Sequence, residues 1–496
     1  MNAPAHTIPI DYERQRATCA ALRAFMPEHS VLFEREDVTP YECDGLSAYR
    51  QVPMVVALPD NEEQVCAILE ACHALRVPVV ARGAGTGLSG GALPMGNGVL
   101  LSLSKLMKIL AIDPLARTAR VQPGVRNLAI SEAAAPLGLY YAPDPSSQIA
   151  CSIGGNVAEN SGGVHCLKYG LTVHNILKLR VATIKGEIIE LGGGGLDAAG
   201  YDLMALMTGS EGLLGVVTEI TVKLLPRPES AQVVLAAFDD VSAAGQAVAN
   251  VIAAGIIPAG MEMMDQAATL AVEPFVNAGY PTDAAGILLV ESDGTHEEVA
   301  DEIRRIEDIM TQSGAHIVRS SQSEAERLRL WAGRKAAFPA VGRLSPDYYC
   351  MDGTIPRKRL AEVLRGIAAM EKKYDLRCAN VFHAGDGNLH PLILYDANDA
   401  GQLQRAENFG AEILKLCIDV GGTITGEHGV GVEKIDSMCM QFKSAELETF
   451  HALKHAFDEH GLLNPGKAVP TLHRCAEFGR MHVHAGAEKF PELPRF

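Results

Sequence analysis

Two histidines flank an Asp-Gly pair in the segment HAGDGNLH, residues 383–390. An Asp-Gly pair favours a two-residue hairpin turn, and such a turn at Asp386-Gly387 would place His383 directly opposite His390. Opposed residues on one face of a hairpin have Cβ atoms about 4.5–5.5 Å apart, close enough for both imidazoles to bind one divalent ion. A solvent-facing histidine pair beside a turn has the same spacing, so this segment alone leaves both interpretations open.

A second reactive pair, Glu427-His428, lies in the glycine-rich segment GGTITGEHGVGVEK, residues 421–434. A loop of this composition can approach a ligand closely because glycine adopts conformations closed to other residues. One carboxylate and two histidines form a common ligand set for zinc or another first-row metal, with positions left open for substrate. A structural loop histidine remains the alternative for His428.

The segment RGAGTGLSGGALP, residues 82–94, is dense in glycine and follows a predicted strand. Gly85, Gly87 and Gly90 match the GxGxxG pattern of dinucleotide-binding Rossmann folds, but that pattern must open a helix. Pro94 and another predicted strand follow here, so we exclude a Rossmann site. Successive glycines can turn their backbone N–H groups toward an anion. The segment therefore predicts a phosphate-binding loop, with a flexible surface turn as the alternative.

Two further glycine loops lie downstream. The first contains Gly154, Gly155, Gly162 and Gly163 around Asn156 and Asn160, and the second contains Gly209, Glu211, Gly212 and Gly215 before a β-branched strand. Separated glycine loops let the backbone approach a large ligand from several sides. Together the three loops fit a ligand that has a diphosphate and a large flat ring.

The elements that must position these residues fall into two regions. Residues 1–50 begin as a helix and form a lead-in, and residues 51–230 alternate short strands with helices before a Pro-rich exit. Residues 231–450 again alternate strands with helices, which indicates an α+β domain of one antiparallel sheet covered by helices. The segment 451–496 ends in a tail of little periodicity.

The bulk properties exclude several classes of function. The 496-residue chain carries a net charge of −17, which argues against nucleic acid or an anionic membrane as its main partner. Its 11 cysteines are scattered without a CxxC pair, so they predict reduced thiols in a cytoplasmic protein rather than a zinc ribbon or iron–sulfur cluster. We recognise no secretory signal and no apolar run of about 20 residues. Any membrane association should therefore be peripheral, through a partner.

The three glycine loops resemble the flavin-binding domain of the vanillyl-alcohol-oxidase/p-cresol-methylhydroxylase (PCMH) superfamily. The segments YECDGLSAYR, YYAPDPSSQIACSIGGNVAEN, WAGRKAAFPAVGRLSPDYYCMDGTIPR and LLNPGKAVPTLHRCAEFGRMHVH also resemble the FAD-linked D subunits of bacterial glycolate oxidases, over nearly the whole chain. Superfamily members that attach flavin covalently through the first loop carry a histidine where this chain has Thr86. The resemblance therefore implies non-covalent FAD.

The resemblance also implies a domain layout: a PCMH-type FAD-binding domain at 51–230, a substrate domain with a metal site at 231–450, and a C-terminal segment, 451–496, that returns to the FAD domain. It implies FAD contacts from all three loops and from that segment: Arg82, Gly83, Ala84, Gly85, Thr86, Gly87, Leu88, Ser89, Gly90, Pro143, Asp144, Gly154, Gly155, Asn156, Asn160, Gly163, Glu211, Gly212, Val217 and Asn464.

For the second region the resemblance implies a divalent metal, with zinc expected, on His383, His390 and Glu427. It implies His428 as the base that takes the substrate hydroxyl proton while hydride moves to the flavin. Arg334 is the expected clamp for the substrate carboxylate because a guanidinium pairs bidentately with a carboxylate. A surface arginine on a helix is the alternative for Arg334.

The residues expected around the substrate are apolar: Phe338, Cys350 and Leu392. Such a lining cannot satisfy a second buried carboxylate, so glycolate or D-lactate is favoured. The resemblance implies a complex with a second FAD-binding subunit and an iron–sulfur subunit, which Cys475, His482 and His484 of the tail could contact unless the tail is disordered. The alternatives are a stand-alone D-lactate or other D-2-hydroxyacid dehydrogenase and a non-catalytic flavin-binding assembly subunit.

Overall fold

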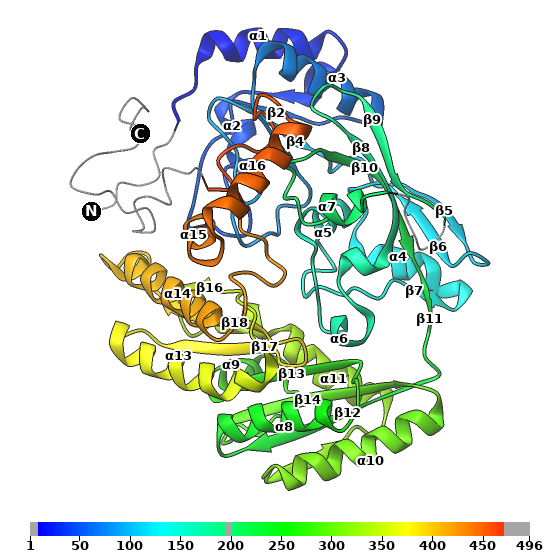
Figure 1. Cartoon of the computed structure of the whole chain (residues 1–496), viewed down its shortest axis with the longest axis vertical. Helices are drawn as coiled ribbons and strands as arrows, with labels where there is room; N and C mark the ends of the chain where they lie inside the picture. Colours follow the sequence, from blue (N-terminus) through cyan, green and yellow to red (C-terminus); the bar gives the residue numbers. More distant parts are fainter. Residues whose placement is uncertain (1–7, 195–199, 471–496) are drawn as a thin grey trace.

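The computed structural model describes residues 8–194 and 200–470 of the chain. Cys475, His482 and His484, predicted to contact a partner, lie outside these ranges. The described chain has two parts (Figure 1): an upper part formed by the elements up to residue 226 and a lower part that begins at β12 (Ser230–Phe238). No helix in the described ranges combines the length and the apolar character needed to cross a bilayer.

A four-stranded sheet in the upper part has the order β1-β2-β4-β3, with β2, β4 and β3 parallel. Its elements are β1 (Val31–Leu32), β2 (Val55–Ala57), α3 (Glu62–Leu75), β3 (Val79–Arg82) and β4 (Val99–Ser102). Helix α3 begins at Asn61, whose side chain accepts a hydrogen bond from the Gln64 N–H, and its buried residues recur at helical spacing. Between β3 and β4 the glycine segment forms no helix, which confirms that the GxGxxG pattern is not a Rossmann site.

The upper part also contains a five-stranded antiparallel sheet of order β5-β6-β10-β8-β9 and a two-stranded sheet of β11 and β7. The strands are β5 (Ile109–Asp113), β6 (Thr118–Val121), β7 (Leu139–Tyr140), β8 (Ile176–Ala182), β9 (Ile188–Gly192), β10 (Val216–Lys223) and β11 (Leu225–Pro226). The helices are α1 (Tyr12–Arg23), α2 (Arg35–Val38), α4 (Asn127–Ala134), α5 (Ile153–Glu159), α6 (Cys166–Tyr169) and α7 (Leu203–Met207).

The lower part is built on one seven-stranded sheet of order β15-β12-β14-β13-β17-β18-β16, and every pairing in it is antiparallel. The remaining strands are β13 (Gly260–Asp265), β14 (Gly286–Gly294), β15 (Ile317–Ser320), β16 (Asp347–Cys350), β17 (Cys378–His383) and β18 (Asn388–Tyr395). The predicted antiparallel sheet of the second domain is confirmed.

Helices cover both faces of this sheet. Alternate residues of β12 enter two different cores, because successive strand side chains point to opposite faces: Val234, Ala236 and Phe238 join one, and Val233, Leu235 and Ala237 join the other. The first core is closed by α8 (Val241–Ala253), α10 (His296–Gln312), α13 (Leu360–Tyr374) and α14 (Gln402–Asp419), and the second by α9 (Gln266–Val276), α11 (Glu324–Lys335) and α12 (Ala337–Val341).

The chain returns to the upper part after the sheet. Helix α15 (Met438–Gln441) still packs on the core of the lower part, and α16 (Ser444–Phe457) lies in the upper part in Figure 1, where the Lys454 ammonium donates to the Leu213 carbonyl oxygen. The segment that follows forms a parallel bridge between Leu463 and Val79, and the Asn464 N–H donates to the Val79 carbonyl oxygen at 2.8 Å. This return places a C-terminal segment against β3 and the first glycine loop.

Candidate active site

The histidine hairpin has a different register from the one predicted. Strands β17 and β18 pair His383 with Asn388 and Val381 with His390, so the two histidines are diagonal neighbours on one face, and the expected direct opposition is wrong. A two-residue Asp-Gly turn needs positive φ at both positions, but only Gly387 has it, at 78°. The turn instead spans four residues. It is also tied to β13, because the Gly385 N–H donates to the Met261 carbonyl oxygen.

The imidazoles nevertheless meet at one carboxylate. The His383 and His390 ring centroids are 5.0 Å apart, and the Glu427 Oε1 atom lies 3.3 Å from His383 Nε2 and 3.0 Å from His390 Nε2. The three residues offer ligand atoms that all lie within 4.8 Å of one another. Diagonal neighbours on the hairpin are thus close enough for both imidazoles to bind one divalent ion, as was expected of a directly opposed pair.

The donor chemistry of this cluster fits a divalent metal. The other ring nitrogens are occupied: His383 Nδ1 lies 2.8 Å from Glu262 Oε1, and His390 Nδ1 lies 3.4 Å from the Met351 carbonyl oxygen. Partners of this kind fix the N–H on Nδ1 and leave Nε2 free as a ligand. Burial alone would raise the pKa of Glu427, but its contacts with His383 and His390 lower it well below the ordinary value and favour the carboxylate.

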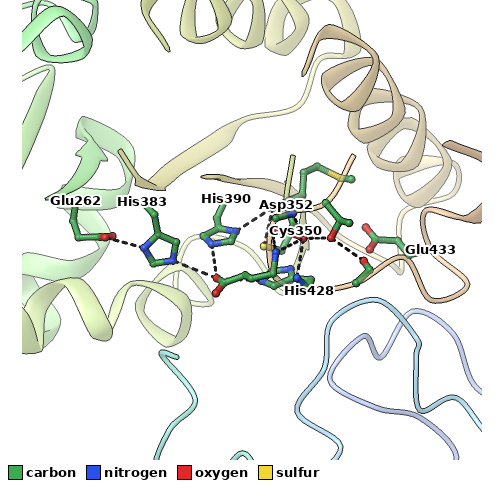
Figure 2. A network of polar contacts seen from close by, with 12 residues as sticks. Glu262, Cys350, Asp352, His383, His390, His428 and Glu433 are labelled. Atoms are coloured by element: carbon green, nitrogen blue, oxygen red, sulfur yellow. Dashed lines mark hydrogen bonds and ion pairs between the residues drawn. The ribbon is translucent and has the colours of Figure 1, made fainter. Parts of the chain in front are cut away.

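Glu262 was missed by sequence reasoning. It lies on β13 with 1% of its surface exposed, and Figure 2 shows it at one end of the contacts that run through His383 to His390. Its partner in the hairpin is 121 residues away in the chain. A lone acidic residue inside the apolar strand GMEMM was the only available signal.

A second ligand set is possible around the same histidine. Cys350, His390 and His428 also offer atoms within 4.8 Å of one another. The Cys350 thiol donates to the Met351 carbonyl oxygen at 3.4 Å, and burial raises its pKa well above the ordinary value, which disfavours the thiolate that would bind metal. The set with Glu427 is therefore the better fit.

The loop that carries Glu427 and His428 is organised by Asp352, which is fully buried. Its carboxylate accepts hydrogen bonds from the Gly426 N–H at 3.1 Å, the His428 N–H at 2.9 Å and the Thr425 hydroxyl at 2.6 Å. The Asp-Gly pair after strand β16 was a turn signal in the sequence, but its partners more than 70 residues downstream were not predictable from it.

His428 is held flat against His390, with ring centroids 4.9 Å apart and an interplanar angle of 7°. Its Nε2 atom lies 4.0 Å from Glu427 Oε1, and its buried Nδ1 atom has no hydrogen-bond partner among the described residues. Burial lowers the pKa of His428 to about 4. The imidazole is therefore neutral near pH 7 and has one ring nitrogen with a lone pair able to accept a proton.

Arg334 lies behind the histidines, at the end of α11. It is 1% exposed, and its Nη2 atom lies 2.6 Å from Glu262 Oε2, so one carboxylate contacts both Arg334 and His383. Its three guanidinium nitrogens have no partner of hydrogen-bond geometry among the described residues. The surface-helix alternative for Arg334 does not match its burial.

A cavity of about 470 Å³ lies between the two parts, with His390, Glu427 and His428 in its wall. Of the residues predicted to bind the cofactor, thirteen line it: Arg82, Gly83, Ala84, Gly85, Thr86, Gly87, Leu88, Gly154, Gly155, Asn156, Glu211, Gly212 and Val217. The wall has no room for side chains at some glycines; a Cβ atom at Gly83 would lie 2.2 Å from Ser152 Oγ. The site fits a large ligand that is approached closely by backbone.

The other predicted cofactor residues do not line this cavity: Ser89, Gly90, Pro143, Asp144, Asn160, Gly163 and Asn464. Several of them position its walls. The Ser89 carbonyl oxygen accepts the Val432 N–H at 3.0 Å, and Asn160 Oδ1 accepts the Val173 N–H at 2.9 Å. Asn464 Nδ2 donates to the Gly91 and Glu211 carbonyl oxygens and so joins the C-terminal segment to two glycine loops.

Glu211 connects the cavity to the loop of Glu427 and His428. Its carboxylate accepts the Val430 N–H at 2.7 Å and the Gly431 N–H at 2.6 Å, two and three residues beyond His428. The side chain predicted to contact the cofactor is thus engaged by the loop of Glu427 and His428. A residue of the upper part therefore helps to set the position of this loop.

An ionic bridge that sequence reasoning missed joins the two parts beside the cavity. His165 Nδ1 lies 3.0 Å from Asp144 Oδ2 in the upper part, and His165 Nε2 lies 3.2 Å from Glu291 Oε1 on β14. The Lys335 ammonium, which lines the cavity, donates to Asp144 at 3.3 Å. Burial alone would lower the pKa of His165, but the charge of Asp144 and hydrogen bonds to both carboxylates raise it to about 10.

Of the residues expected around the substrate, Phe338 lines the cavity, whereas Cys350 and Leu392 lie in the buried core and do not line it. The Phe338 ring lines the cavity with its centroid 6.1 Å from that of His390, and it packs against Tyr348. Cys350 and Leu392 pair across β16 and β18, and both are buried. These residues belong to the core on the α9, α11 and α12 face of the sheet.

Comparison with known proteins identifies both parts of the molecule. Residues 53–192 match the family described as FAD binding domain, and residues 227–468 match FAD linked oxidases, C-terminal domain. The glycolate oxidase subunit GlcD of Escherichia coli (strain K12) is 65% identical over 476 residues, which cover 96% of this chain and 95% of the relative. The chain belongs to the GlcD family of FAD-linked oxidases.

Other members and neighbours of the family agree with this placement. The glycolate oxidase subunit GlcD of Bacillus subtilis (strain 168) is 42% identical over 86% of this chain and 91% of the relative. The D-lactate dehydrogenase of Anaerostipes hadrus is 30% identical over 93% of this chain and all of the relative. The predicted superfamily fold is confirmed by p-cresol methylhydroxylase, which is 17% identical with a TM-score of 0.77 over 94% of this chain and 99% of that one.

Proposed function

We propose that this FAD-dependent enzyme oxidises glycolate to glyoxylate with the assistance of a divalent metal, zinc being expected. The observation that carries the proposal is the convergence of His383, His390, Glu427 and His428 in and beside the wall of the glycine-loop cavity. An assembly subunit without catalytic activity would not need three histidines and a carboxylate at that wall.

FAD, when bound, accepts a hydride from C2 of a 2-hydroxy acid, and a divalent metal gives Lewis-acid assistance to loss of the hydroxyl proton. His383, His390 and Glu427 would hold the metal through two Nε2 atoms and a carboxylate oxygen. His428 would accept the hydroxyl proton at an imidazole nitrogen, since burial keeps that imidazole neutral. The pair of electrons leaves with the hydride, so the organic product is the 2-oxo acid.

Arg334 and Lys335 supply the positive charge that a substrate carboxylate requires. The Arg334 guanidinium already forms an ion pair with Glu262, but no hydrogen bond of standard geometry satisfies its N–H groups among the described residues, and a substrate carboxylate would bind them bidentately. Lys335 presents a second cation at the cavity wall. Because Arg334 itself does not line the cavity, its role as a clamp needs a shift of its side chain toward the substrate.

The apolar residues near His390 support a small substrate. Phe338 in the cavity wall, packed against the core that contains Cys350 and Leu392, offers no partner for a second carboxylate, which disfavours dicarboxylic 2-hydroxy acids. A single methyl group separates glycolate from D-lactate, and hydrophobic pockets discriminate poorly between such ligands. The 30% identical D-lactate dehydrogenase makes D-lactate the second candidate substrate.

We also propose that the FAD is bound non-covalently, since Thr86 in the first loop is no flavin attachment residue. We propose that the electrons pass to a second FAD-binding subunit and an iron–sulfur subunit; the name of the relatives, glycolate oxidase subunit, supports a partner of some kind. Release of FAD on acid precipitation of the protein would support non-covalent binding.

The proposal is tested by anaerobic reduction of the bound flavin with a panel of glycolate, D-lactate, L-lactate and D-2-hydroxyglutarate, followed by the flavin absorbance. We expect glycolate to bleach the flavin fastest. His390→Ala should keep the flavin but lose the metal and the bleaching, whereas the exposed His296→Ala should behave as wild type. Rapid bleaching by glycolate in a fully metal-free wild-type protein would refute the metal role, and no bleaching by any 2-hydroxy acid would refute the function.

A further inference from the structure

A second cavity, of about 210 Å³, reaches the histidine cluster. Its wall consists of Gly162, Gly163, Cys166, Gly170, Leu171, His174, Thr354, His383, Asp386, Asn388, Gly426 and Glu427. Glu427 lines both cavities, but His390 and His428 line only the first and His383 only the second. The proposed metal ligands therefore form a partition that can be approached from two directions.

The two cavities differ in the cations of their walls. The large cavity has Arg82 and Lys335 beside three glutamates, Glu159, Glu211 and Glu427, and these two cations suit an anionic substrate and a diphosphate. The small cavity has the carboxylates of Asp386 and Glu427 and neither lysine nor arginine in its wall. The neighbouring Arg357 donates to the Gly385 carbonyl oxygen and stays outside that wall. A carboxylate-lined passage attracts cations and repels 2-hydroxy acids.

The small cavity leads from the surface to the cluster. At its outer end His174 is exposed, and at its inner end His383 is 4% exposed. Asn388 in the same wall is 6% exposed, and its Oδ1 atom has no hydrogen-bond partner among the described residues. An unpartnered amide oxygen is a suitable transient ligand for a partly hydrated cation.

We propose that the small cavity is the path by which a divalent cation reaches His383, His390 and Glu427, separate from the path of the substrate. The inference rests on the proposed function, because it requires a metal on these residues. With flavin and substrate in the large cavity, the small cavity provides the other approach to Glu427 in the described part of the chain. Metal could then exchange while the flavin stays bound.

The test measures metal uptake directly. The flavoprotein is stripped of metal with a chelator, FAD retention is verified by absorbance, and Mn²⁺ is added while the loss of the free Mn²⁺ EPR signal is followed. Burial raises the pKa of Asp386 to about 7, so uptake is followed at pH 8, where Asp386→Asn removes a charge at constant size. Leu171→Trp narrows the passage. Asp239→Asn and Leu115→Trp, at side chains that are largely exposed elsewhere, are the matched controls.

We expect Asp386→Asn to slow Mn²⁺ uptake by roughly threefold to tenfold, the scale on which one charge changes an association rate. Leu171→Trp should slow it further, and both controls should match wild type. The final Mn²⁺ content and the glycolate KM of the loaded enzyme should be unchanged in all variants. A wild-type protein that binds no Mn²⁺ would instead refute the metal role in the proposed function.

Two other outcomes would overturn the path itself. Uptake rates in Asp386→Asn and Leu171→Trp equal to wild type would show that cations enter elsewhere. A raised glycolate KM in both variants, with unchanged Mn²⁺ uptake, would make the small cavity a substrate path.

Discussion

The two walls of the main cavity are built by different means. On the FAD-binding side the wall is largely backbone: glycines at 83, 85, 87, 154, 155 and 212 approach the cavity with no side chain. On the opposite side it includes the side chains of His390, Glu427 and His428. Buried carboxylates hold this side in place: Asp352 binds the loop of His428, and Glu262 holds His383, which contacts Glu427 from outside the cavity wall. A substitution on one side of the cavity should therefore reduce FAD affinity without affecting the metal site, and a substitution on the other side should do the reverse.

This difference also determines what each wall tolerates. A backbone wall is sensitive to added volume because a new Cβ atom has nowhere to go. A wall of imidazoles is sensitive to removed hydrogen bonds. An imidazole that binds a metal through Nε2 needs a partner that holds its Nδ1 atom. Variants can be chosen that damage one wall and leave the other intact.

The largest effect is expected for Glu262→Gln, which replaces the carboxylate that holds His383 Nδ1 and pairs with Arg334. Loss of such a partner typically weakens metal binding about 10–100-fold. We expect Zn²⁺ affinity, measured by competition with a chelator, to fall by that factor at unchanged FAD content. Glu273→Gln, at a carboxylate that caps backbone N–H groups on the same domain, is the matched control. Equal loss of FAD and metal would mean that Glu262 only stabilises the fold.

Glu262 also shows where the sequence stops being informative. The glycine loops, the antiparallel sheet and the residues His383, His390, Glu427 and His428 were predictable because local composition, strand pattern and family resemblance all point to them. The carboxylates behind them, Glu262, Asp352 and Glu291, act on residues 70 or more positions away, and no local pattern encodes that pairing.

The hairpin register failed for a related reason. The Asp-Gly pair predicts a tight turn when only neighbouring residues are considered. In the fold, the hydrogen bond from the Gly385 N–H to Met261 on β13 widens the turn to four residues. A tertiary contact thus overrides a local preference, and the histidines remain on one face because the shift moves the pairing by an even number of residues.

A smaller effect is expected on the backbone wall from Gly83→Ala. The new Cβ atom would lie 2.2 Å from Ser152 Oγ, and overpacking of this kind costs about 1–3 kcal/mol. The FAD dissociation constant, measured by flavin fluorescence, should rise roughly tenfold or more while Zn²⁺ affinity stays as in wild type. Gly193→Ala, where a Cβ atom meets nothing within 4 Å, is the control. Restoration of FAD affinity by a second change, Ser152→Gly, would confirm that the collision is the cause.

The smallest expected effect is on thermal stability, and it concerns the ionic bridge that His165 forms between Asp144 and Glu291. The pKa of His165 is about 10 in the folded protein, against about 6.5 when unfolded. A raised histidine pKa contributes stability that is complete below pH 6.5 and is lost as the pH rises through 10. His165→Gln should therefore lower Tm by about 2–4 °C at pH 6.5, and the difference should shrink toward pH 10. Thermal unfolding of both proteins across this range measures it, with His296→Gln as the exposed control. A difference that stays constant with pH would mean that packing, and not the ionic bridge between Asp144 and Glu291, explains the role of His165.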